Sequence, residues 1–310
     1  MDEPGSRWQP LAERLFDGVF AVDGDLRITF WNPAAQQLTG WSADELLGTP
    51  RPDDLLVRIP DDDPRHDAAD DPLAATLRDG RSRDGEAWLR HRQGHLVPVR
   101  VRTLALPSAD GSSAGALELF SDNTPRALPL RQTEELEAQS FLDPLTGIGN
   151  RAAAGDALEQ RLFALRRLDV PLAVLLVDLD MLVRINDRLG RDLGDHVLCM
   201  VARTLHHGIR SRSDAVYRWG GEEFVVLVQI TDGDTLRRFC EKLRRLVEHS
   251  GFAGPDGRVA VTVSIGATRA TPDDTPESLV RRADAWMVRS KEAGRNCATC
   301  EPEPPALPQP

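Results

Sequence analysis

The chain has 310 residues, with 38 Lys and Arg against 49 Asp and Glu, which gives a formal net charge of −11. This length exceeds what one typical hydrophobic core organises and predicts two domains. Hydrophobic residues make up 41% and charged residues 28%, as in an ordinary globular protein. The acidic balance excludes non-specific binding to nucleic acid or to an anionic membrane, so we expect neither partner.

Targeting and redox signals are sparse. No stretch approaches the ~20 apolar residues of a membrane helix, and the acidic residues 1–4 lack the pattern of a signal peptide. We therefore expect a cytoplasmic protein. All four cysteines lie in the second half, which does not indicate a disulfide framework. Cys297 and Cys300 have redox or zinc spacing, but without a second pair we interpret them as incidental thiols.

The first half begins with a hairpin pattern and one helical patch. Strand-like runs at 18–22 and 26–31 flank Asp23-Gly24-Asp25, which is a turn signal. Asn32-Pro33 indicates a helix start, because proline is favoured at the first helical position. Residues 42–45 form a capping box, which predicts a second helix start.

An acidic stretch separates this patch from further strands. Residues 53–71 are rich in aspartate, and we interpret them as a solvated loop. Strand-like runs follow at 87–91, 96–106 and 115–120. A helical patch within a mostly antiparallel sheet predicts an α+β module of the size of a sensor domain.

Short motifs in this half resemble the PAS family. They are Gly18–Asp23, Trp31–Ala35, Leu38–Trp41, Glu45–Gly48 and Asp122–Thr124, the last at the position where PAS domains often end. The resemblance covers residues 8–124 and implies a sensor or dimerisation domain. The family does not specify the ligand or signal, which stays unknown.

Two classes of PAS cofactor can be weighed on the residues. A photoactive flavin relative needs a pocket cysteine, and this half has none. A haem relative needs an axial histidine, for which the candidates are His66, His91 and His95. We interpret His66 as a surface residue, because its aspartate neighbours suit water better than a haem pocket.

Residues 125–140 form a connector that Pro125 and Pro129 interrupt. Glu134–Gln139 is helix-prone, but the segment is too short to establish a coiled coil. By resemblance, a connector at this place pairs two subunits and transmits the signal.

The second half contains an apolar run that ends in a carboxylate. Residues 171–177 are continuously apolar, which indicates a buried strand, and Asp178 follows directly. Asp180 lies on the same side if the strand persists. A cap or turn role is the alternative for Asp180, whereas Asp178 at the strand exit suits a Mg²⁺ ligand.

A helix and a hairpin follow. Apolar residues between 197 and 209 recur at helical spacing. Strand-like runs at 215–219 and 222–228 flank Gly220-Gly221, a tight turn where bare backbone lets a ligand approach. Taken alone, Glu222 and Glu223 read as solvated charges at a hairpin.

Several ordered motifs resemble the GGDEF family instead. Gly220–Phe224 is the GGEEF form of its signature, and the other motifs are Asp143–Arg151, Asp178–Asp180, Ile185–Asp187, Gly194-Asp195, Val263–Ala267 and Ala283–Asn296. The resemblance implies a domain over 141–298 with an α/β palm related to nucleotidyl cyclases. The expected fold class is thus α/β (α+β) with two domains, a PAS domain followed by this palm, and a disordered tail at 299–310.

The family's functional residues carry over position by position. By resemblance, Asp178, the Leu179 carbonyl and Glu222 hold Mg²⁺ or Mn²⁺. Glu222 also accepts the proton of the ribose 3′-hydroxyl, and Glu223 assists metal binding. The residues implied to bind the substrate are Asn186 and Asp195 for guanine and Lys291 and Arg295 for the triphosphate. The chain has two lysines, so a lysine kept at 291 suggests a constraint at that site.

The resemblance implies a diguanylate cyclase, which condenses two GTP into cyclic di-GMP and releases pyrophosphate. Each subunit holds one GTP, so the enzyme is expected to be a homodimer under control of the PAS signal. The alternative is a catalytically silent regulator that binds GTP or cyclic di-GMP. A third alternative, a cyclase making mixed cyclic dinucleotides, is disfavoured by Asp195, where those relatives carry a small hydroxyl residue.

Three positions depart from the family. Val183 stands where a lysine proposed to stabilise the transition state is expected, and Arg184 is one helical step of ~100° away. Gly190-Arg191 replaces a Gly-His pair. Ser211–Asp214 lacks the first arginine of an Arg-x-x-Asp product-binding site, so Asp214 belongs to a degenerate inhibitory site and we expect weak or absent product inhibition there.

Overall fold

The computed structural model describes residues 8–52, 54–57, 71–107, 113–123, 141–209, 211, 213–254 and 257–302. The chain forms two compact units, Met1–Thr124 and Pro125–Pro310. His66 and the connector predicted at 125–140 lie outside the described residues. Within the described ranges, no helix has both the length and the apolar character needed to cross a membrane.

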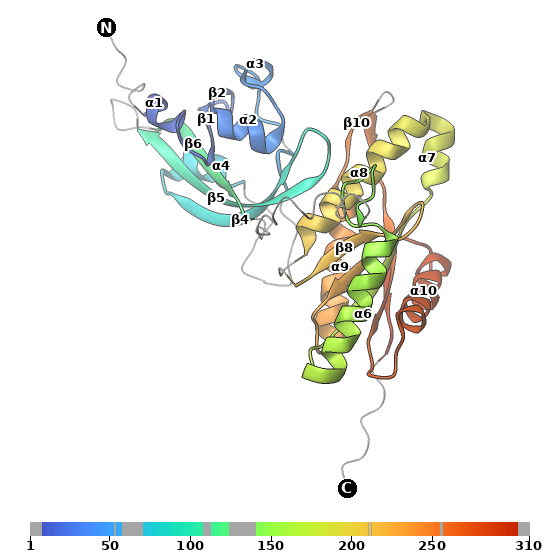
Figure 1. Cartoon of the computed structure of the whole chain (residues 1–310). Coiled ribbons are helices and arrows are strands. Elements are labelled where there is room, and N and C mark those ends of the chain that lie inside the picture. The colour runs from blue at the N-terminus through green and yellow to red at the C-terminus, as the bar shows by residue number, and fades with distance from the viewer. Residues whose placement is uncertain are drawn as a thin grey trace. The chain divides into compact units, whose positions relative to one another are not determined.

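The N-terminal unit is built on an antiparallel sheet (Figure 1). Its described strands are hydrogen-bonded in the order β2-β1-β6-β5-β4-β3. The strands are β1 (Gly18–Asp23), β2 (Ile28–Trp31), β3 (Leu56–Val57), β4 (Arg83–Arg90), β5 (Leu96–Pro107) and β6 (Ser113–Asp122). The helices are α1 (Gln9–Ala12), α2 (Pro33–Thr39), α3 (Ala43–Leu46) and α4 (Pro72–Asp79). This arrangement confirms the predicted α+β module.

Local signals explain the start of this unit. The Asp23 carboxylate accepts hydrogen bonds from the backbone N–H groups of Asp25 and Arg27, which close the predicted turn. Asn32 caps α2 by accepting from Ala35 N at 2.8 Å. The buried Asn32 amide also accepts from Val19 N and donates to the carbonyls of residues 12 and 17, so it ties α1, β1 and α2 together.

The C-terminal unit has a second sheet, with the described strands in the order β13-β12-β7-β9-β8. Strands β12 and β13 are parallel, and the other pairs are antiparallel. The strands are β7 (Ala173–Leu179), β8 (Ala215–Arg218), β9 (Glu223–Val228), β12 (Val263–Arg269) and β13 (Ala298–Cys300). A separate hairpin is formed by β10 (Phe252–Gly254) and β11 (Gly257–Val259).

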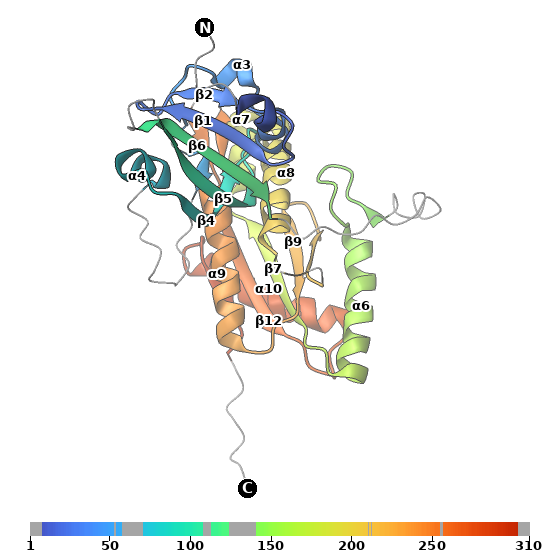
Figure 2. The same ribbon diagram turned by 90° about the vertical axis from the view of Figure 1, so that its left-hand side faces the viewer.

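Helices cover both faces of this sheet. They are α6 (Arg151–Leu168), α7 (Leu182–Leu189), α8 (Arg191–Gly208), α9 (Gly233–His249) and α10 (Pro276–Glu292). Figure 2 shows α9 and α6 on opposite sides of the strands. One core joins α6 and α10 to alternate residues of β7, including Val174 and Leu176. A Cβ at Gly266 of β12 would lie 2.0 Å from the Met287 nitrogen, so α10 packs directly on this strand.

The prediction of a disordered tail from residue 299 is wrong for its first two residues. Thr299 and Cys300 belong to β13, where they pair with Gly266 and Ala267 of β12. Composition alone missed this strand, because its pairing partner lies more than 30 residues earlier in the sequence. Residues 303–310 lie outside the described part of the chain.

Candidate active site

Two antiparallel strands bring the predicted carboxylates together. Every residue of β7 is buried, and Asp178 is 3% exposed near its carboxyl end. Asp178 pairs in register with Glu223, the first residue of β9. The Leu179 N–H donates to the Glu222 carbonyl at 3.1 Å, so both glutamates of the hairpin lie beside the end of β7.

Burial is the largest cause that raises the pKa values of the three carboxylates at this place. Burial raises the pKa of Asp178, and the Lys291 ammonium opposes this shift from 2.8 Å. Burial and the Asp178 charge raise the pKa values of Glu222 and Glu223 as well. Negative charge therefore accumulates here beyond what Lys291 neutralises, which favours a bound cation.

The donor chemistry of this cluster fits a hard divalent cation. Carboxylate and carbonyl oxygens are the ligands that Mg²⁺ prefers, and Asp178, Leu179 and Glu222 supply oxygens at adjoining backbone positions. Among the described residues, no three Asp, Glu, His or Cys side chains already converge on one point. Lys291 instead holds an Asp178 oxygen, so a metal has to displace or share that contact.

The residues predicted to bind guanine lie on neighbouring helices. Gly190, at φ 88°, separates α7 from α8. Asn186 of α7 packs on Gly194 of α8, where an added Cβ would come within 1.7 Å of Asn186 Oδ1. Asp195 follows Gly194 directly. The buried Asn186 Oδ1 has no hydrogen-bond partner among the described residues, which suits an atom awaiting a ligand.

The residues predicted to bind the triphosphate follow each other at the end of α10. Lys291 lies in its last turn. Arg295 and Asn296 both adopt left-handed backbone, with φ 67° and 45°. Asn296 holds this turn: its N–H donates to Asp180, its amide donates to Glu248 at 2.7 Å, and its oxygen accepts from Arg244 at 2.7 Å.

Asp180 has a structural role in the turn after β7, in agreement with the cap or turn alternative. Strand β7 ends at Leu179, and the buried Asp180 carboxylate accepts from the hydroxyls of Thr262 and Ser264 at 2.7 and 2.6 Å. With the contact from Asn296, all these donors come from residues more than 80 positions away. Asp180 therefore joins β7 to the turn that carries Arg295.

Sequence reasoning missed the support behind the GGEEF hairpin. Arg218 donates to both oxygens of Asp143 at 3.0 and 3.2 Å and to the Gly221 carbonyl at 2.8 Å. The Thr146 N–H and hydroxyl donate to the same carboxylate. Arg218 thus connects the opening motif of the domain to the turn that precedes Glu222. The sequence offered one signal for this contact: Asp143 belongs to the motif that opens the domain, but no ligand was assigned to its carboxylate.

The three departures from the family pattern have defined surroundings. Val183 is 61% exposed on α7, and Arg191 starts α8 with an exposed side chain. The Asp214 carboxylate accepts from the backbone N–H groups of Ser211 and Gln229. Arg210 and Arg212, which flank the missing arginine, lie outside the described residues.

The central sheet, its acidic edge and the cations at the end of α10 are the features against which the comparisons with known proteins can be set. Residues 140–297, a little over half of the chain, match the family described as diguanylate cyclase, GGDEF domain. Residues 6–122 match the PAS fold. The chain belongs to the GGDEF family and carries a PAS domain before its GGDEF domain.

Individual relatives agree with this assignment. Diguanylate cyclase DgcP of Pseudomonas aeruginosa is 36% identical over 163 residues, 53% of this chain and 24% of that protein. Diguanylate cyclase DgcM of Escherichia coli is 34% identical over 200 residues, 61% of this chain and 48% of that protein. Diguanylate cyclase SiaD of P. aeruginosa, solved with its activator SiaC, is similar with a TM-score of 0.52 and 30% identity over 55% of this chain and 65% of that one. The chain thus spans less than half the length of DgcP and of DgcM.

Proposed function

We propose that this protein is a diguanylate cyclase that condenses two GTP into cyclic di-GMP with release of pyrophosphate. The observation that carries the proposal is the acidic end of β7 and β9, where Asp178, Glu222 and Glu223 adjoin Lys291. Membership of the GGDEF family and the names of its relatives support the same activity.

In this proposal each 3′-oxygen attacks the α-phosphorus of the other GTP. A new P–O bond forms as the bond to the β-phosphate breaks, and pyrophosphate leaves. Glu222 accepts the hydroxyl proton as the general base. Lys291 and Arg295 hold the triphosphate, while Asn186 and Asp195 hold guanine. Asp178, the Leu179 carbonyl and Glu222 would hold Mg²⁺ or Mn²⁺, which would neutralise charge on the phosphates.

The reaction needs two nucleotides facing each other, so the active form in this proposal is a homodimer. The PAS domain then acts by favouring or opposing the meeting of two GGDEF domains, in response to a signal that its fold does not identify. GTP supply agrees with a cytoplasmic location. The degenerate site at Asp214 implies weak inhibition by the product.

The test is incubation of the full chain with GTP and Mg²⁺, followed by chromatography of the nucleotides. We expect cyclic di-GMP from the wild type, with a rate per subunit that rises with protein concentration as dimers form. Glu222→Gln, which keeps the shape and removes the base, is expected to make none. A wild type without product at any concentration, but with measurable GTP binding, would establish the silent regulator, which the exposed Val183 in the lysine position favours.

The contact between Asn186 and Gly194 gives a second test. Gly194→Ala places a methyl group where Asn186 Oδ1 lies, so the amide has to move. We expect the KM for GTP to rise roughly tenfold, the loss of about one good hydrogen bond. Unfolding is not the cause, because alanine favours a helix over glycine by about 1 kcal/mol.

The matched control is Gly155→Ala on α6, where nothing lies within 4 Å of the added Cβ. This variant is expected to keep the wild-type KM. Equal KM values for the wild type and Gly194→Ala would show that Asn186 does not hold the substrate in this packing.

A further inference from the structure

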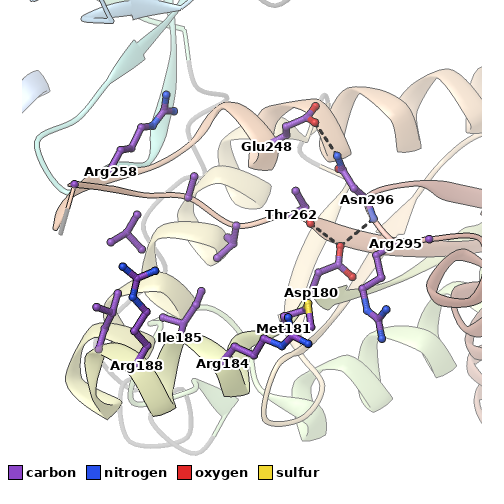
Figure 3. A pocket seen from close by; sticks show the side chains of 16 residues that line it. Asp180, Met181, Arg184, Ile185, Arg188, Glu248, Arg258, Thr262, Arg295 and Asn296 are labelled. Atoms are coloured by element: carbon purple, nitrogen blue, oxygen red, sulfur yellow. Dashed lines mark hydrogen bonds between the residues drawn. The ribbon is translucent and has the colours of Figure 1, made fainter. Parts of the chain in front are cut away.

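A hollow of about 630 Å³ lies between α7, the β10–β11 hairpin and the turn after α10. Arg184, Arg188, Arg258 and Arg295 line it (Figure 3). Among the described residues, Asp178, Glu222, Glu223 and Lys291 do not line it. Arg295 is therefore the residue that this hollow shares with the candidate triphosphate site.

The acidic residues of this hollow are already engaged. Asp180 accepts from Thr262, Ser264 and Asn296. Glu248 pairs with Arg244 and accepts from Asn296. Within the part of the chain that the structure describes, Arg184 and Arg295 form no ion pair with a carboxylate. The hollow therefore carries a net positive charge in a chain whose overall charge is −11.

The cations are spread over the length of the hollow. In Figure 3 the Arg184 side chain extends from α7 in the direction of Asp180 and Arg295, and Arg188 extends toward the strand that carries Arg258. Arg258 donates to the carbonyls of residues 249 and 250, which fix its position without cancelling its charge. Like charges around one hollow repel each other, so an anion bound there is favoured.

The hollow adjoins the candidate active site at the end of α10. Gly294 and Arg295 line the hollow just after Lys291, whose Nζ lies 2.8 Å from the Asp178 carboxylate. Val183, in the position of the expected lysine, does not line the hollow, but its neighbour Arg184 does. Arg184 and Arg295 therefore line the same hollow.

We propose that this hollow is an oligophosphate-binding site that adjoins the active site through Arg295. Guanidinium groups bind phosphate oxygens with paired, charge-assisted hydrogen bonds, and α7 and the turn after α10 contribute such groups here. The natural occupant is pyrophosphate released by the reaction, an identification that rests on the proposed function. The triphosphate end of GTP is the other source of the same chemistry.

The test is calorimetric titration of the full chain with inorganic pyrophosphate in buffer without divalent metal. Arg184→Ala and Arg188→Ala are each expected to weaken binding about tenfold, the loss of one charge-assisted contact. The control is Arg281→Ala, which removes an exposed arginine of α10 outside the hollow and is expected to keep wild-type affinity. Lys291→Gln, which removes a cation of the candidate active site that does not line the hollow, distinguishes binding in the hollow from binding in the active site.

The proposal is overturned if the wild type does not bind pyrophosphate, or if both arginine variants bind it as the wild type does. It is also overturned if Lys291→Gln alone abolishes binding, which would place the anion in the active site. Turnover of GTP then separates the two sources. If Arg184→Ala and Arg188→Ala are inhibited less by added pyrophosphate and keep the wild-type KM for GTP, the hollow binds free pyrophosphate. If their KM for GTP is raised, the hollow binds the triphosphate end of GTP. Because the titration needs no turnover, an inactive chain would contradict the proposed function and leave this test intact.

Discussion

Replacing Lys291 with alanine is expected to lower kcat/KM for GTP by roughly 100-fold or more, the effect of removing one preorganised charge from a phosphoryl-transfer site. Lys291 Nζ lies 2.8 Å from the buried Asp178 carboxylate, at the end of the strand pair that carries both glutamates. The variant loses a phosphate ligand and also leaves Asp178 without its cation. The pKa of Asp178, already raised by burial, rises further.

Two variants define the cause of that loss. Lys291→Arg keeps the charge and is expected to recover part of kcat/KM, while Lys242→Ala removes the chain's other lysine, on α9, and is expected to have little effect. Initial rates of cyclic di-GMP formation over a range of GTP concentrations separate kcat from KM. A Lys291→Ala variant with wild-type kcat/KM would remove Lys291 from the proposed mechanism.

Local patterns predicted the strands that build the site. The apolar run at 171–177 became β7, and Asp178 stands near its end as expected, because burial on both faces leaves a continuous signature in the sequence. The hairpin around Gly220-Gly221 also formed, since its turn residues and strand residues are neighbours in the chain. Local patterns could not predict the contacts of each carboxylate, because these depend on residues far away in the chain. Asp180 is the clearest example, since its hydroxyl donors lie more than 80 positions later.

Most of the contacts that sequence reasoning missed are long-range. The resemblance assigned Lys291 to phosphate and Asp178 to metal, but not their direct contact. Asn296 was part of a motif without a role, and the structure gives it three partners, two on α9 and one directly after β7. The cysteines make the same point: Cys300 Sγ lies 3.8 Å from Cys240 Sγ, which no spacing rule for nearby cysteines would find.

The last prediction concerns the ion pair behind the hairpin. Arg218→Ala is expected to destabilise the chain by about 2–3 kcal/mol at pH 7, because it leaves the mostly buried Asp143 carboxylate without its cation. The same change removes the bond to the Gly221 carbonyl, so kcat is expected to fall as the turn before Glu222 loosens. Urea unfolding gives the stability, and a double-mutant cycle with Asp143→Asn isolates the pair.

The pH dependence identifies the mechanism of this destabilisation. Burial raises the pKa of Asp143, but the hydrogen bonds from Thr146 and Arg218 outweigh it, and the folded pKa lies below the usual value of about 3.9. The stabilisation is therefore complete above that value and is lost as pH falls through the folded pKa. The stability difference between wild type and Arg218→Ala is expected to be full at pH 7 and to shrink below about pH 4. A difference that stays constant into acid would mean that Arg218 acts through packing, and its connection to the GGEEF turn would then be steric rather than ionic.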